Sequence, residues 1–353
     1  PESTLVAEIV KDILKKLDRS SISDHQGIVG IEDHIARIQS LMHLESPDIR
    51  IIGIWGMGGI GKTTIAKQIY HKLALQFDSR SLVLNVREKI ERHGIEDIRN
   101  KYISELLEED TSFSNERLKR TKVLLILDDV NGSCQLKDLI GGRGDFGQGS
   151  RIILTSRDKQ VLKIAEAEIY DVKGMNSQDS LNLFSIHAFK QNHPKETYMH
   201  LSKEVLHYAK GIPLALQILG SLLFGRTEVE WEDELQKLKK HPDSNILNVL
   251  KLSYDGLDEQ QKNIFLDIAC FYRGYEEIGV AQKLEDCGFF PKIGMAVLKD
   301  RCLISILNGK IEMHDLIQEM GREIVRQECP DNPGNHSRLW KDEEIYRVLK
   351  NNK

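Results

Sequence analysis

The chain has 353 residues, which is long for one ordinary domain and predicts two or three. Its 49 basic and 54 acidic residues give a formal net charge of −5, which argues against a protein that coats nucleic acid and against a polybasic membrane binder. No apolar run approaches the roughly 20 residues that span a bilayer, and five scattered cysteines without metal-ligand spacing predict reduced thiols in the cytoplasm.

The first segment of the chain has a helical pattern. Apolar residues at helical spacing within residues 4–17 predict an amphipathic lead-in helix, and we assign residues 1–23 to a linker that carries it. Because the chain starts at Pro1 rather than at Met, we expect it to be a segment of a longer protein.

Residues 24–173 alternate short strands with helices. The strands are rich in Ile, Val and Leu and lack an alternation of polar and apolar residues, which is typical of a parallel sheet covered by helices on both faces. The predicted strands are Arg50–Trp55, Leu82–Val86, Val123–Leu127, Arg151–Thr155 and Ile169–Val172. This region therefore predicts an α/β domain.

Residues 174–241 have a helical pattern throughout, which predicts a helical bundle. The predicted helices are Asp179–Phe189, Tyr198–Ala209, Leu214–Leu223 and Glu228–Lys239.

Residues 242–328 combine helices with a hairpin. The predicted helices are Ser244–Leu252, Asp258–Cys270, Tyr275–Glu285 and Ile293–Asp300. Asn308-Gly309 then separates the strand-like runs Cys302–Leu307 and Lys310–Met313, and an Asn-Gly pair is a strong hairpin signal because both turn residues need positive φ. Helices followed by a hairpin predict a winged-helix domain. The polar residues 329–353 read as a boundary segment.

The sharpest chemical signal is a glycine-rich run between the strand ending at Trp55 and a predicted helix over Thr64–Leu75. It fits the pattern G-x-x-x-x-G-K-[ST], in which backbone N–H groups and a helix N-terminus surround phosphates. Lys62 is expected to reach the β- and γ-phosphates, and the Thr63 hydroxyl to ligate Mg²⁺. The predicted nucleotide-binding residues of this loop are Gly56, Met57, Gly58, Gly59, Ile60, Gly61, Lys62, Thr63 and Thr64.

Two further strands end in charged residues. Asp128 and Asp129 follow Val123–Leu127, and we expect Asp128 to hold Mg²⁺ and Asp129 to orient an attacking water or to serve as an ion-pair residue. Arg157 follows the next strand, where a guanidinium can contact a γ-phosphate or a surface carboxylate. No Asn-Lys-x-Asp base-reading motif is present, which favours ADP or ATP over a guanine nucleotide.

In this order, the motifs resemble the NB-ARC module of plant intracellular immune receptors, the nucleotide-binding, leucine-rich-repeat proteins, and most of all the subclass with an N-terminal TIR domain. The match covers about Gln26 to Leu349. Besides the phosphate loop, the motifs are Ile28–Ile31, Asn85–Glu88, Leu127–Asn131, Leu183–Lys190, Gly211–Leu216, Phe265–Phe271 and Met313–Asp315.

The resemblance implies an α/β P-loop NTPase of the STAND/AAA-like type at residues 24–173, followed by a helical domain (ARC1) at 174–241 and a winged-helix domain (ARC2) at 242–328. It implies a switch with slow ATPase activity at most, autoinhibited with ADP and active with ATP and Mg²⁺. Its implied partners are a TIR domain, leucine-rich repeats beyond the 329–353 linker, and further copies on activation, in the cytoplasm with the nucleus as a second compartment. Any NAD hydrolysis would belong to the TIR domain.

The resemblance also implies residue roles. Val29 and Gly30 would lie near the adenine, and Pro213 would pack against the nucleotide. Arg157 would read the γ-phosphate. The regulatory triplet is Met313, His314 and Asp315, of which His314 would contact the ADP β-phosphate while Asp315 holds its geometry.

Two other functions remain open from the sequence. A P-loop ATPase motor would need a strong base, and no Glu stands beside Asp128. A DNA-binding regulator would need a basic winged helix, whereas residues 241–330 hold ten basic and fifteen acidic residues. We therefore expect neither nucleic acid nor a membrane as a partner.

Overall fold

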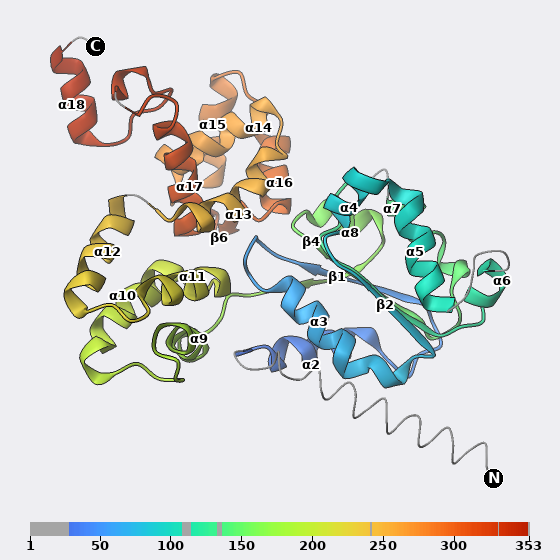
Figure 1. Cartoon of the computed structure of the whole chain (residues 1–353). Coiled ribbons are helices and arrows are strands. Elements are labelled where there is room, and N and C mark those ends of the chain that lie inside the picture. The colour runs from blue at the N-terminus through green and yellow to red at the C-terminus, as the bar shows by residue number, and fades with distance from the viewer. Residues whose placement is uncertain (1–27, 108–113, 133–135, 241, 331, 352–353) are drawn as a thin grey trace.

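The computed structural model describes residues 28–107, 114–132, 136–240, 242–330 and 332–351. The lead-in helix expected within residues 1–23 lies outside this part of the chain. The described residues form an α/β part, a helical part and a second helical part that carries a small hairpin (Figure 1). None of the described helices is long and apolar enough to cross a membrane.

The α/β part is built on a five-stranded parallel sheet in the order β2-β3-β4-β1-β5. Its strands are β1 (Arg50–Trp55), β2 (Ser79–Val83), β3 (Val123–Leu127), β4 (Arg151–Ser156) and β5 (Glu168–Asp171). Every residue of β3 and β4 is buried, as expected for strands covered on both faces. The predicted parallel α/β sheet is therefore confirmed.

Helices cover both faces of this sheet. Ile52, Ile54 and Leu124 share one apolar cluster with α2 and α3, whereas Leu125 and Ile152 face the opposite cluster with α5, α7 and α8. The helices of this part are α2 (Glu32–Met42), α3 (Lys62–Leu73), α4 (Val86–His93), α5 (Ile95–Leu107), α6 (Ser114–Leu118), α7 (Leu136–Ile140) and α8 (Lys159–Ile164).

One strand prediction is wrong in position. The sequence predicts Leu82–Val86, whereas β2 covers Ser79–Val83. The strand ends early because Asn85 adopts a left-handed conformation, with φ of 52°, and Val86 then starts α4. Ser79 and Ser81 are tolerated in β2 because it is an edge strand. Their hydroxyls donate to Leu106 O and Glu105 on α5.

A buried arginine holds α2 in place. The Arg151 side chain is fully buried at the start of β4 and donates to the carbonyls of Met42, His43, Ser46 and Asp48. These carbonyls belong to the C-terminal end of α2 and to the loop that follows it. A guanidinium with several carbonyl partners satisfies groups that would otherwise be buried without hydrogen bonds, so α2 is fixed relative to the sheet.

The helical part contains α9 (Ser177–Phe189), α10 (Met199–Ala209), α11 (Pro213–Leu223) and α12 (Glu228–Lys240). Its core is centred on Trp231, whose ring stacks on Phe189 with centroids 5.4 Å apart and whose Nε1 donates to Leu223 O. The predicted helices of this region are confirmed, with ends that differ by one or two residues.

The second helical part contains α13 (Ser244–Asp255), α14 (Glu259–Asp267), a π-helical turn (Ile268–Tyr272), α15 (Glu277–Asp286), α16 (Pro291–Asp300) and α17 (Asp315–Arg326). Strands β6 (Ser305–Leu307) and β7 (Lys310–Glu312) pair antiparallel around Asn308 and Gly309, whose φ angles are 51° and 75°. The predicted hairpin is confirmed, and so is the winged-helix arrangement of helices and wing.

The polar segment after residue 328 contains a helix that the sequence analysis did not predict, α18 (Asp342–Asn351). Arg338 attaches the segment to α14 because its Nε donates to Asp267 at 2.5 Å and its Nη2 donates to Asn263 O at 3.1 Å. The Trp340 ring lies against the guanidinium groups of Arg322 and Arg326 on α17.

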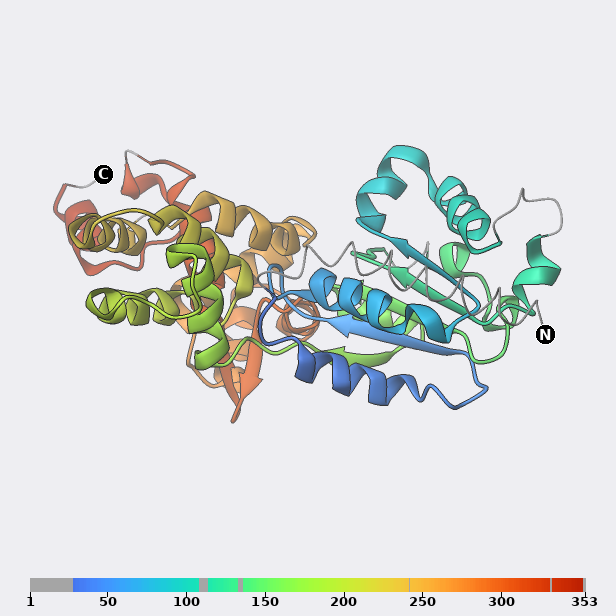
Figure 2. The ribbon, with the colours of Figure 1, turned by 60° about the horizontal axis from the view of Figure 1, so that its bottom comes forward.

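Both helical parts lie at one end of the sheet (Figure 2). Trp55 at the end of β1 donates from Nε1 to Asp300 O at 2.9 Å, and Arg301 Nη2 lies 3.4 Å from Asp158 Oδ2. The winged-helix part therefore contacts the carboxyl ends of the strands, where parallel α/β sheets usually bind ligands. The four cysteines in the described residues are free thiols.

Candidate nucleotide-binding site

The glycine-rich loop connects β1 to α3, as the sequence predicts. Gly59 and Gly61 have φ angles of 76° and 102°, a region that side-chain-bearing residues rarely adopt, and Gly61 is the N-cap of α3. Gly59 is also in close contact with the helical part, because Leu214 N donates to Gly59 O at 3.2 Å. A Cβ on Gly58 would lie 2.8 Å from Arg157 Nη1. The loop therefore requires glycine for its turn and for its close neighbours.

Lys62 lies inside the loop. Only 8% of the residue is exposed, and Nζ donates to Gly56 O at 2.7 Å and to Met57 O at 2.9 Å. Burial and, after it, the nearby Arg157 cation lower the pKa of Lys62 to about 8, although Cys302, Asp129 and Asp128 oppose the shift. The amine is thus held where an added anion would stabilise its charged form.

A hydroxyl and a carboxylate lie together beside Lys62. Thr63 Oγ1 donates to Asp128 Oδ1 at 2.9 Å, and Thr155 Oγ1 donates to the same oxygen at 2.7 Å. Asp128 is buried, and the two threonine hydroxyls donate hydrogen bonds to its carboxylate. Within the described residues there is no group of three or more His, Cys, Asp or Glu side chains that could hold a metal. Mg²⁺ usually takes one or two protein ligands and completes its shell with phosphates and water, so Thr63 and Asp128 fit it.

Asp129 lies between two arginines. Its carboxylate is 3.2 Å from Arg87 Nη2 and 3.7 Å from Arg157 Nε, and its backbone has a φ of 57°. This geometry is that of an ion-pair residue, the second of the two roles that the sequence left open, although Asp129 also lines the cavity beside Lys62. Its role towards water stays a prediction.

Arg157 connects the loop with the winged-helix part. Its Nη1 donates to Val249 O in α13 at 2.6 Å, and the residue lines the same cavity as Lys62. Burial lowers the pKa of Arg157, and the Asp129 carboxylate opposes that shift.

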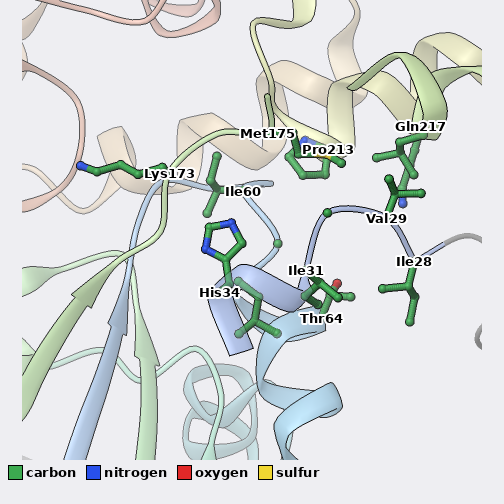
Figure 3. A pocket seen from close by; sticks show the side chains of 14 residues that line it. Ile28, Val29, Ile31, His34, Ile60, Thr64, Lys173, Met175, Pro213 and Gln217 are labelled. Atoms are coloured by element: carbon green, nitrogen blue, oxygen red, sulfur yellow. The ribbon is translucent and has the colours of Figure 1, made fainter. Parts of the chain in front are cut away.

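Two adjoining cavities make up the site. The polar one, of about 250 Å³, is lined by Gly59, Gly61, Lys62, Thr63, Thr64, Asn85, Asp128, Asp129, Thr155, Arg157, Pro213, Leu214 and Gln217. The apolar one, of about 90 Å³, is lined by Ile28, Val29, Gly30, Ile31, His34, Ile60, Gly61, Thr64, Ile65, Lys173, Met175, Leu183, Pro213 and Gln217 (Figure 3).

The two cavities share Gly61, Thr64, Pro213 and Gln217. A polar chamber with a lysine and a carboxylate next to an apolar chamber matches the two ends of a nucleotide, its phosphates and its base. The predicted residues Val29, Gly30 and Pro213 all lie in the walls of the apolar chamber.

The Met313–Asp315 triplet lies elsewhere. Met313 is buried in the core. His314 is the N-cap of α17: its Nδ1 accepts a hydrogen bond from Leu316 N, and its Nε2 lies 3.5 Å from Lys210 O. Burial lowers the pKa of His314. None of the three lines either cavity, so the predicted contact of His314 with a phosphate stays a prediction.

Asp315 makes two ion pairs, each 2.5 Å long, with Lys210 Nζ and Arg273 Nη2. Burial alone would raise its pKa, but the hydrogen bonds from Lys210 and Arg273 outweigh this and lower it. Lys210 precedes the turn that leads to Pro213, so Asp315 contacts a side chain from the segment just before Pro213 rather than His314 itself.

Several residues in these walls were not predicted as site residues, among them the polar side chains of His34, Thr155, Lys173 and Gln217. Gln217 had a signal, because it stands four residues after Pro213 on one helix and so shares its face. Lys173 follows the last strand of the sheet. For His34 and Thr155, the sequence gives no indication of a role in the site beyond the helix or strand to which each belongs.

Two parts of the chain match known protein families. Residues 31–194 match the NB-ARC domain family, and residues 258–329 match the family described as "Disease resistance protein Roq1-like, winged-helix domain". The chain is an NB-ARC module of the plant disease resistance family. Residues 31–194, which include the phosphate loop, are therefore its NB-ARC domain.

Two relatives illustrate the likeness. The chain is 41% identical over 360 residues to disease resistance protein RUN1 of Vitis rotundifolia, with 99% of this chain and 27% of that protein covered. It is 40% identical over 368 residues to TMV resistance protein N of Nicotiana glutinosa, with 99% and 32% covered. The chain thus spans about a quarter to a third of the length of these relatives.

The fold is also similar to that of a solved structure. A Walker-type ATPase of Pyrococcus abyssi superimposes with a TM-score of 0.60 at 14% identity, covering 84% of this chain and 97% of that one. At this identity the likeness concerns the fold alone.

Proposed function

We propose that this NB-ARC module is the nucleotide-operated switch of a plant disease resistance receptor, closed with ADP and opened by exchange for ATP with Mg²⁺. The observation that carries the proposal is the position of Arg157. Its guanidinium lines the phosphate cavity and also donates to Val249 O in the winged-helix part. A γ-phosphate that attracts this side chain would compete with Val249 and Asp129 for it.

The helical part contacts the same site. Pro213 and Leu214 line the polar cavity, and Leu214 N donates to Gly59 O. Nucleotide held between these parts would stabilise their closed arrangement, by about 2.7 kcal/mol at a concentration 100 times the Kd. Reversing a 99:1 population needs about 5.5 kcal/mol of differential binding, so contacts from further domains would contribute to the switch.

The wider setting belongs to the proposal as well. The relatives are three to four times longer than this chain. We place a TIR domain before it, leucine-rich repeats after it, self-association on activation, and a cytoplasmic location with the nucleus as a second compartment. Within the site, Lys62 would bind phosphate, Thr63 and Asp128 would hold Mg²⁺, and Arg157 would distinguish ATP from ADP.

The test is to identify the nucleotide that the purified chain retains. Mass spectrometry of the nucleotide released by denaturation should find ADP in near-stoichiometric amount. Small-angle scattering with ADP and with a non-hydrolysable ATP analogue plus Mg²⁺ should then give a larger radius of gyration in the second sample. Many ATP turnovers per minute would instead indicate a motor, and equal scattering with both nucleotides would contradict the switch.

A further inference from the structure

The wall of the apolar chamber includes the imidazole ring of His34, which does not line the phosphate chamber. Four of its lining side chains are polar: His34, Thr64, Lys173 and Gln217. Thr64 and Gln217 also line the phosphate chamber, and Lys173 is exposed and ion-paired with Asp171. His34 is half-buried, and its ring rises from α2 toward Ile60 across the chamber (Figure 3).

Tyr170 fixes the orientation of this ring. His34 Nδ1 is hydrogen-bonded to Tyr170 Oη at 2.7 Å, and the two rings meet edge to face with centroids 5.8 Å apart. Tyr170 lies on β5 opposite Ile54 of β1, and Arg151 fixes the α2 helix that carries His34. The ring cannot turn without losing its hydrogen bond, and within the described part of the chain His34 Nε2 has no protein partner.

We infer that His34 recognises the nucleobase through a hydrogen bond from Nε2 to the edge of the base, with Tyr170 as its positioning residue. The inference rests on the proposed function, because it needs a nucleotide with its phosphates at Lys62 and its base in the apolar chamber. An apolar chamber supplies burial to any base but little discrimination between bases, so a directional polar atom in its wall carries the specificity.

The charge state of the ring fits this role. Burial lowers the pKa of His34, the Arg37 cation adds to the effect, and Asp33 opposes it. Tyr170 is the titratable group in direct contact with the ring, and its own pKa is raised by burial. A neutral imidazole has one donor and one acceptor nitrogen.

The two neutral tautomers assign different partners to Nε2. If Tyr170 donates to Nδ1, Nε2–H donates to a purine ring nitrogen; if Tyr170 accepts, Nε2 accepts from a 6-amino group. Beside N1 the donor tautomer favours adenine, whose N1 has no hydrogen, and beside C6 the acceptor tautomer favours adenine, whose 6-amino group donates. The donor tautomer beside C6, or the acceptor tautomer beside N1, would favour guanine. Guanine presents the opposite pattern there, with a hydrogen on N1 and an oxygen at C6.

The experiment measures equilibrium binding of ADP and of analogues to the whole chain by calorimetry. The analogues are IDP, which replaces the 6-amino group with oxygen, and 1-, 3- and 7-deaza-ADP, each of which lacks one ring nitrogen. We expect the wild-type chain to bind ADP about 5-fold more tightly than at least one analogue, the usual size of one neutral hydrogen bond.

Three variants assign the effect. His34→Phe keeps an aromatic ring without nitrogen and should bind ADP about 5-fold more weakly while no longer discriminating against that analogue. His34→Gln, whose amide nitrogen lies close to the position of Nε2, should recover part of the discrimination. Tyr170→Phe should reduce discrimination, since the ring loses its orienting partner. His200→Phe, at an exposed position on α10, is the matched control and should equal the wild type.

Each result decides the question. A His34→Phe chain that binds ADP like the wild type overturns the inference, and so does one that binds all ligands more weakly but keeps the wild-type discrimination, because that pattern is structural. A wild-type chain that binds no nucleotide overturns the proposed function as well. Retained ADP with unchanged discrimination in His34→Phe leaves the proposed function in place and removes this inference alone.

Discussion

At the scale of single residues, Lys62 is a buried cation whose pKa responds to its surroundings. Its amine is buried, bonded to two carbonyls of its own loop, and close to the Arg157 cation. Bound phosphate would bring negative charge to an amine that the protein alone does not fully compensate. Both the shape of the Lys62 side chain and its protonation state should therefore affect nucleotide binding.

Lys62→Arg should abolish retention of nucleotide. A planar guanidinium is larger than an ammonium and cannot enter a loop whose carbonyls at Gly56 and Met57 lie 2.7 and 2.9 Å from Nζ. Mass spectrometry of the nucleotide that co-purifies checks this. Lys67→Arg, an exposed position on the same helix, is the control and should retain nucleotide. Normal retention in Lys62→Arg would count against the assigned role.

Nucleotide affinity should fall as pH rises through about 8. The pKa of Lys62 is lowered to about 8, so above that pH the free protein loses the ammonium proton that a phosphate needs. Binding must then return the proton, and affinity should fall by up to about 10-fold per pH unit. Calorimetry from pH 7 to 9.5, in two buffers of different ionisation enthalpy, measures the proton uptake. A flat profile without uptake would contradict it.

At the scale of elements, the contact between the phosphate loop and the first turn of α11 joins two domains. Gly59 O accepts from Leu214 N, and a Cβ on Gly59 would lie only 2.9 Å from Leu214 Cβ. Pro213 starts α11 with the backbone angle that a first helical turn requires, so the approach of this helix to the loop is rigid. Any added atom at Gly59 must push the loop and the helix apart.

Gly59→Ala should weaken nucleotide retention and lower the free energy of unfolding by more than about 1 kcal/mol. Part of the loss is the strain of a φ of 76° on alanine, and the rest is the clash with Leu214. Gly225→Ala is the matched control, because Gly225 has a φ of 74° with nothing within 4 Å of an added Cβ. Chemical denaturation of both variants separates the backbone strain from the clash with Leu214. Equal losses of unfolding free energy in the two variants would mean that the contact with Leu214 contributes nothing.

At the scale of the whole molecule, the winged-helix part contacts the other two parts through separate sets of polar bonds. Trp55, Arg157 and Lys163 connect the α/β part to it through Asp300 O, Val249 O and the Asp300 carboxylate. Lys210 connects the helical part to it through Asp315. The two ion pairs among them, Lys163–Asp300 and Lys210–Asp315, are partly exposed and therefore individually weak, so nucleotide binding can shift the balance between closed and open arrangements.

Asp315→Val should speed the release of ADP. The change removes both ion pairs of Asp315 and leaves Lys210, close to the turn before Pro213, without its carboxylate. It also removes an acidic residue from the first turn of α17, where a negative charge is favourable. We expect a dissociation rate about 10-fold higher, in line with the loss of roughly 1.4 kcal/mol. A fluorescent ADP analogue measures the rate.

The control for that experiment is Asp255→Val, at an exposed position at the end of α13. Its release rate should equal that of the wild type. If Asp315→Val releases ADP at the wild-type rate as well, the bond between Lys210 and Asp315 does not restrain the site.

Local patterns in the sequence predict the parallel sheet, the hairpin and the phosphate loop from Gly56 to Thr64. These features depend on short spacings: continuous apolar runs for buried strands, an Asn-Gly pair for a tight turn, and glycines followed by Lys62 and Thr63 for a phosphate loop. Asp128 also belongs to this class, because carboxyl ends of neighbouring parallel strands meet at one edge. The family resemblance placed Val29, Gly30 and Pro213, which their local spacing alone would not have placed.

The partners of the charged residues and the wall of the apolar chamber depend instead on how distant segments pack together. Arg157 meets Val249 across 92 residues of sequence, and His34 meets Tyr170 across 136. Asp315 contacts Lys210 rather than His314 because the end of α10 packs near the start of α17. Such contacts result from how whole elements pack, and burial then sets the pKa values of Lys62, His34 and His314, so no local pattern encodes them.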